Sequence, residues 1–198
     1  SIIDQQALPE SIEIELTGEV VLAHEEISAA LTGIEIAGVA SILILGVILL
    51  VGIGDVRIIS AIFLVLLTGV GLTLGYATLT IGSFNTLSML FVVMFFGLGV
   101  DFAAHLALRL QADQATNADT MIAAIQDMAP ALALCTVTSA IAFLSFTPTA
   151  YAGMAELGII SAGGMVIALL LTLLMIPAFL TLWPPLKKPP PLTFLSVK

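Results

Sequence analysis

The chain has 198 residues, of which 60% are hydrophobic and only 10% are charged. A soluble domain carries about 25% charged residues, so this chain has too few to cover a surface that faces water. The composition therefore indicates a protein that lies in a lipid bilayer.

The net charge of −9 comes from the N-terminal part of the chain. Eight of the fourteen acids lie in residues 1–35, which leaves six acids and five bases for the rest. No basic patch occurs, so nucleic acid is excluded as a partner. Cys135 is the single cysteine, which excludes an internal disulfide and a cysteine-based metal site. We therefore expect neither a metal nor a cofactor.

Five segments are apolar and long enough to cross a bilayer, which takes about 20 residues of helix. They cover residues 36–53, 58–81, 85–108, 129–146 and 157–183. The breaks between them coincide with glycine or proline at Gly54, Gly82, Pro148 and Pro184. Strands of a membrane barrel are shorter and alternate in polarity. We predict an all-α integral membrane protein, with a five-helix transmembrane domain over residues 34–183.

Residues 111–128, between the third and fourth spans, are too polar to cross a membrane. We interpret them as a separate amphipathic helix on the cytoplasmic membrane surface, capped by Asp119. Its apolar face would consist of Met121, Ala124, Ile125 and Met128.

The N-terminal residues 1–33 have the pattern of an exterior segment. Residues 12–16 alternate like a strand, and residues 19–32 are typical of a polar helix that leads into the first span. The chain starts at Ser1 without an initiator methionine or signal peptide, which favours a piece of a larger protein. We therefore expect residues 1–33 to be the end of an exterior domain.

The bases predict the orientation of the chain. Arg57, Arg109 and the lysines of the 184–198 tail all lie on one side, and the connections on the other side contain no base. The positively charged side of a membrane protein is cytoplasmic. We expect a multi-pass protein of the bacterial inner membrane, with a periplasmic N-terminus and a cytoplasmic C-terminus.

Asp101 is the one acid well inside a predicted span. A carboxylate at membrane depth costs on the order of 3 kcal/mol, so such residues face the protein interior or a water path. Asp101 lies about 10 Å from the cytoplasmic end of its helix, at 1.5 Å per residue. It is a candidate proton carrier; the alternative is a carboxyl satisfied by Ser and Thr hydroxyls, without a transport role.

The residues around Asp101 favour an interior position for the third span. Gly97 and Gly99 would allow another helix to approach, and His105 lies one turn after Asp101, where it would relay a proton or pair with the carboxyl. Thr138 and Ser139 of the fourth span would hydrogen-bond Asp101. The alternatives are a histidine at the headgroups and hydroxyls that bond the carbonyls of their own helix.

Four blocks of the sequence resemble the resistance–nodulation–division (RND) superfamily of transporters. Residues 97–102 (GLGVDF) resemble the G-x-x-x-D-[YF] signature of its fourth helix, and residues 138–146 (TSAIAFLSF) are similar to its fifth. Residues 155–165 (AELGIISAGGM) resemble the start of its sixth. Leu16-Thr17-Gly18 with Glu25-Glu26 is similar to the end of its exterior domain. The nearest branch is the MMPL lipid-exporter type, which includes hopanoid-transporter-like proteins.

The resemblance implies that this chain holds helices two to six of one half of such a transporter. The same unit is called a sterol-sensing domain in eukaryotic relatives. The proton-relay acid of the family corresponds to Asp101, and its usual tyrosine neighbour is Phe102 here, without a hydroxyl. Membrane lipids, a hydrophobic substrate and the other half of the transporter are the implied partners, and a homo-oligomer is a further possibility.

Three functions compete at this point. The first is proton-gradient-driven export of lipids or other hydrophobic molecules, and the second is a lipid-sensing module without transport. The third is an intramembrane aspartyl protease, but such an enzyme needs two carboxyls in one site and the spans supply one. We therefore expect no catalytic residues.

Overall fold

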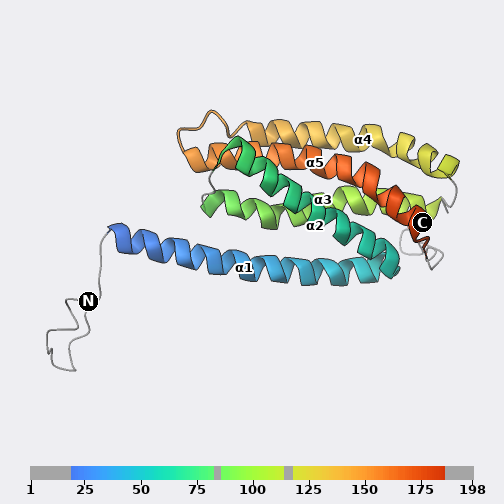
Figure 1. Ribbon diagram of the computed structural model, residues 1–198, viewed down its shortest axis with the longest axis horizontal. Helices are drawn as coiled ribbons and strands as arrows, with labels where there is room; N and C mark the ends of the chain where they lie inside the picture. Colours follow the sequence, from blue (N-terminus) through green and yellow to red (C-terminus); the bar gives the residue numbers. More distant parts are fainter. Residues whose placement is uncertain (1–18, 83–85, 114–117, 186–198) are drawn as a thin grey trace, which may run out of the picture.

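The computed structural model describes residues 19–82, 86–113 and 118–185, and in these ranges every regular element is an α-helix (Figure 1). Each of the five helices is long and apolar enough to cross a membrane, which confirms the predicted fold class. The strand predicted at residues 12–16 lies outside the described residues. The helices are α1 (Glu19–Gly52), α2 (Val56–Thr80), α3 (Thr86–Ala112), α4 (Ala118–Leu144) and α5 (Ala152–Leu182).

Two glycines end helices where the sequence predicted breaks. Gly54 follows α1 with a φ of 65°, and Gly82 follows α2 with a φ of 81°. Both lie in the left-handed region, which glycine enters without the steric cost of a Cβ atom. Asp55 then caps α2, because its carboxylate accepts a hydrogen bond from the Arg57 backbone N–H at 2.9 Å. The polar loop between α1 and α2 therefore has a defined conformation.

The predicted surface helix at residues 111–128 is wrong as a separate element. Residues 118–128 form the first turns of α4, which continues through Pro130 to Leu144. Proline removes one backbone hydrogen bond, but a membrane helix tolerates this where neighbouring groups compensate. The predicted apolar face packs inward, with Met121 and Ala124 buried.

α3 lies at the centre of the bundle and contacts all four other helices. α1 runs along one side and α4 along the other, while α5 packs against α2, α3 and α4 (Figure 1). Half of the apolar span of α3 is buried, against 6% for α1 and 11% for α4. α1 and α4 are therefore the outer helices of this unit.

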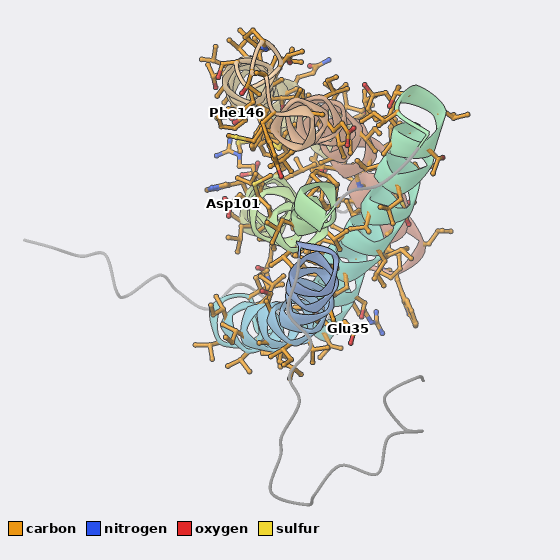
Figure 2. The ribbon with its side chains drawn as sticks, turned by 90° about the vertical axis from the view of Figure 1, so that its left-hand side faces the viewer. Glu35, Asp101 and Phe146 are labelled. Atoms are coloured by element: carbon orange, nitrogen blue, oxygen red, sulfur yellow. The ribbon has the colours of Figure 1, made fainter. Side chains whose placement is uncertain are left out.

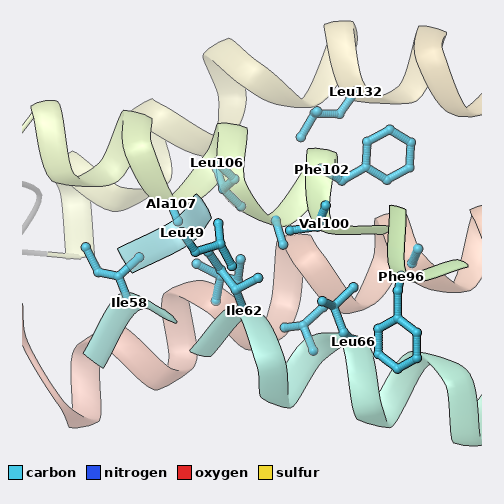
Figure 3. Packing of buried hydrophobic residues seen from close by; sticks show 14 of the residues in the cluster. Leu49, Ile58, Ile62, Leu66, Phe96, Val100, Phe102, Leu106, Ala107 and Leu132 are labelled. Carbon is cyan, nitrogen blue, oxygen red and sulfur yellow. The ribbon is translucent and has the colours of Figure 1, made fainter. Parts of the chain in front are cut away.

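The core forms where α2, α3 and α5 meet, and Figure 3 shows part of it. Ile58, Ile62 and Leu66 of α2 face Leu106 and Phe96 of α3 in this region. All of them are at most 5% exposed. The most deeply buried part of the molecule is thus the layer that packs against the middle of α3.

Glycines on α5 allow the helices to pack closely. A Cβ atom on Gly164 would lie 2.5 Å from the ring of Phe91, and one on Gly163 would overlap the ring of Tyr76. By contrast, an added Cβ atom on Gly71 or Gly75 would have nothing within 4 Å, so these two glycines of α2 make no close helix contact among the described residues. The close contacts lie on the α5 side of α2.

The helix ends near Arg57 and Arg109 form what we call the basic end of the bundle. α1, α3 and α5 end there, and α2 and α4 begin there. Arg57 donates a hydrogen bond from Nη1 to the Pro184 carbonyl at 2.7 Å, and its guanidinium lies 5.8 Å from the Trp183 ring centre. These contacts tie the start of α2 to the end of α5.

Candidate functional site

Asp101 lies in the middle of α3, on the exposed side of the bundle. Figure 2, which looks along the helices, shows it at the edge of the bundle between α1 and α4. Within the described ranges its carboxylate makes no hydrogen bond and no ion pair. Asp101 is thus an exposed carboxyl on the central helix, without a polar partner among the described residues.

The expectation that the third span is surrounded by protein is only half met. α3 is the central helix, yet Gly97, Asp101, His105 and Leu108 are all exposed. Their spacing of three or four residues places them on one face of the helix, which we call the Asp101 stripe. The described helices cover the other faces of α3 and leave this one open.

The two glycines before Asp101 have different surroundings. A Cβ atom on Gly99 would lie 2.9 Å from Leu66 Cδ2, so this glycine lies where α2 crosses α3. A Cβ atom on Gly97 would have nothing within 4 Å. The close approach predicted at Gly97 is therefore not made by the described helices.

Phe102 points away from the Asp101 stripe. It is 6% exposed and belongs to the buried cluster, where Leu132 of α4 lies opposite its ring (Figure 3). Phe102, although it directly follows Asp101 in the sequence, thus lies in the interface between α3 and α4. An aromatic ring without a hydroxyl suits this apolar place, because a buried hydroxyl requires a hydrogen-bond partner.

The hydroxyls of α4 bond their own helix. Thr138 donates to the carbonyls of Leu134 and Cys135 at 3.0 Å, and Thr136 donates to the Leu132 carbonyl at 2.9 Å. Thr138 is exposed and Ser139 is half-buried. The bond from Thr138 to Asp101 that we considered is not formed, and the local alternative is observed.

Sequence reasoning missed a group of charges at the basic end. Arg109 forms ion pairs with Asp113, which directly follows α3, and with Asp127 on α4, at 3.0 and 3.1 Å. The spacing of four residues between Arg109 and Asp113 is a recognisable signal for a pair on one helix. The contact with Asp127 joins two helices and has no such local signal.

A groove between α1 and α3 opens beside the Asp101 stripe. It has a volume of about 270 Å³. Its lining is apolar except for one hydroxyl and consists of Ser41, Ile44, Leu45, Ile48, Val93, Phe96 and Gly97. A site with these properties suits the acyl or ring portion of a lipid.

The chain belongs to the MMPL family, whose model matches residues 1–191. With its five apolar helices, it is a multi-pass membrane protein. Two similar proteins are named hopanoid transporters, both called HpnN. The one from Burkholderia multivorans is 37% identical over 175 residues, which make up 87% of this chain and 20% of the relative.

The second relative comes from Rhodopseudomonas palustris and is 32% identical over 184 residues. The match takes in 91% of this chain and 21% of that protein. The chain therefore spans about a fifth of the length of the curated relatives that it matches. Its helices correspond to one part of a much larger membrane protein in those relatives.

Proposed function

We propose that this chain is part of a proton-motive-force-driven transporter that exports lipids or other hydrophobic molecules, with Asp101 as the proton relay. The observation that carries the proposal is a single carboxyl on the central helix, on a face that the described helices leave open. Ionisable groups at membrane depth are costly and are usually kept for function. The names of the relatives support a lipid as the substrate class.

The open Asp101 stripe also favours contact with another protein surface in the whole transporter. An exposed carboxylate against acyl chains has a high free energy, and a second protein surface or a water path lowers it. Gly97, one turn from Asp101 and without a neighbour, leaves room for a helix to approach there. We propose that the rest of the transporter covers this stripe.

The stripe residues Asp101 and His105 and their buried neighbour Phe102 have distinct roles in this mechanism. Asp101 takes up a proton when its surroundings open to one side of the membrane and releases it when they open to the other. His105, one turn nearer the basic end, passes protons between Asp101 and water on that side. Phe102 holds α3 against α4 and carries no proton. The proton gradient supplies the free energy, and no cofactor takes part.

The groove between α1 and α3 favours a second candidate, a lipid-sensing module without transport. Its apolar lining suits a lipid, and Asp101 has no part in it. Replacing Asp101 by Asn separates the two candidates in the intact protein. A transporter stops exporting, whereas a sensor keeps both its bound lipid and its function.

We further propose an inner-membrane location with the basic end in the cytoplasm. Arg57 and Arg109 lie at that end, and the 145–151 connection at the other end contains no base. This predicts opposite labelling of two exposed positions in a Cys135→Ser background. Ala112→Cys should react only with an impermeant thiol reagent on the cytoplasmic side, and Thr149→Cys only from outside. Labelling of Ala112→Cys from outside would reverse the orientation.

A further inference from the structure

Two arginines lie at the basic end of the bundle, and their partners differ. Arg109 pairs with two carboxylates, at 3.0 and 3.1 Å, which neutralise its charge. The Arg57 guanidinium has two neutral partners, the Pro184 carbonyl at 2.7 Å and the Trp183 ring at 5.8 Å. No carboxylate forms an ion pair with it in the part of the chain that the structure describes. Arg57 therefore keeps a positive charge that an anionic ligand would neutralise.

The acid nearest to Arg57 in the sequence does not pair with its side chain. Asp55 is 1% exposed and accepts a hydrogen bond from the backbone N–H of Arg57, at 2.9 Å. Its carboxylate caps the start of α2 and is buried away from a ligand at the surface. Arg57 itself is only half-buried. A guanidinium has five N–H donors, and among the described residues one of them is bonded, so donors remain for a ligand.

Trp183 places a second kind of donor beside the guanidinium. It is 56% exposed, and its indole N–H makes no hydrogen bond within the described ranges. A tryptophan at the end of a membrane helix is typical of the level of the lipid headgroups. Lys187 and Lys188 follow it in the sequence, and bases next to a membrane helix attract anionic lipids. A guanidinium and an indole N–H at this depth suit the phosphate of a lipid.

The neighbours of these two residues offer apolar surface for acyl chains. Val56 directly precedes Arg57 and is 61% exposed, and Leu182 directly precedes Trp183 and is 85% exposed. Both lie at the ends of membrane-spanning helices, where the acyl chains of a lipid begin below its headgroup. A lipid would gain free energy by covering these side chains, whereas a free phosphate ion would not. The combination of charge and apolar surface therefore favours a lipid.

We propose that Arg57 and Trp183 bind the phosphate of an anionic phospholipid at the basic end of the bundle. The guanidinium pairs with one phosphate oxygen, the indole N–H donates to another, and the acyl chains lie against Val56 and Leu182. The contacts of Arg57 with the end of α5 hold its guanidinium in place, so little side-chain entropy is lost on binding. The site is separate from the proton relay and does not depend on it.

The test is the affinity of the intact protein for dioctanoyl-phosphatidylglycerol. The protein is delipidated in detergent, the lipid is added in steps, and the bound lipids are counted by native mass spectrometry. Arg57→Gln should weaken one binding step by about fivefold, which is the contribution of one basic side chain at a membrane surface. Glutamine keeps an N–H donor for the Pro184 carbonyl, so the midpoint of thermal unfolding should stay close to that of the parent.

Three further variants separate this site from general effects. Arg57→Lys keeps the charge and should bind nearly as well as the parent. Trp183→Phe keeps a ring but removes the N–H donor, so it should weaken the same step by less than Arg57→Gln does. Arg109→Gln is the matched control, because it lowers the net charge of the same end by the same amount from an arginine that carboxylates already neutralise. It should leave the lipid count unchanged.

Equal weakening by Arg57→Gln and Arg109→Gln would overturn the site, because the effect would then be one of net charge. An Arg57→Gln protein that binds like the parent would overturn it too. So would equal affinity of the parent for dioctanoyl-phosphatidylcholine, whose choline cation cancels the charge of its phosphate. Displacement of the lipid by an equal concentration of inorganic phosphate would overturn a lipid as the occupant and assign the site to a free anion.

Discussion

Asp101→Asn should abolish gradient-driven export in the intact protein and leave folding and membrane insertion unchanged. Asparagine has nearly the same size as aspartate but cannot bind and release a proton. It also removes a charge that is costly at membrane depth, so the free energy of unfolding should stay the same or rise. The measurement is lipid efflux from vesicles under an imposed proton gradient, beside a check of expression and thermal unfolding.

Two further variants should reduce export by less than Asp101→Asn does. Asp101→Glu keeps a carboxyl but moves it by one methylene, so partial export should remain. His105→Ala should reduce export less than Asp101→Asn, because it changes access to the carboxyl and not the carboxyl itself. A well-folded Asp101→Asn protein that exports like the parent would refute the relay and favour the lipid-sensing alternative.

Gly158→Ala should separate α4 from α5 at the end opposite the basic end. The added Cβ atom would lie 2.5 Å from the Phe143 carbonyl oxygen and 3.3 Å from Phe146 Cβ. The first of these is a backbone atom, which cannot turn aside as a side chain does. Overpacking of this kind costs about 1–3 kcal/mol. The expected result is a lower midpoint of thermal unfolding in detergent.

Gly71→Ala is the matched control for this substitution. Gly71 also lies inside a membrane helix, but an added Cβ atom there has nothing within 4 Å. Alanine favours a helix over glycine by up to about 1 kcal/mol, so the midpoint should stay the same or rise slightly. If both variants unfold at the same temperature, the α4–α5 crossing is not as close as described.

The number of membrane-spanning helices and most of their ends were predictable from the sequence. Long apolar runs are a strong signal, and Gly54 and Gly82 end α1 and α2 through a backbone conformation that glycine favours. The start of α4 was misplaced because the polarity of residues 111–128 suggested a separate surface helix, whereas residues 118–128 continue into the apolar span as one helix.

The surroundings of the candidate site were less predictable. Asp101 could be identified as a candidate functional residue from the sequence, since an acid inside an apolar run is rare. Which face of α3 the neighbouring helices cover depends on tertiary packing, so Gly97 and Gly99 could not be distinguished beforehand. The ion pair of Arg109 with Asp127 joins residues on two helices, and the periodicity of either helix does not indicate the other.

The most direct measurement is proton movement itself, recorded together with lipid movement. The intact protein is reconstituted in vesicles that contain a pH-sensitive dye, and a lipid substrate gradient is imposed without a pH gradient. The account predicts a substrate-dependent change of internal pH with the parent and none with Asp101→Asn. Proton movement of equal size with Asp101→Asn, or lipid movement by the parent without any proton movement, would contradict it.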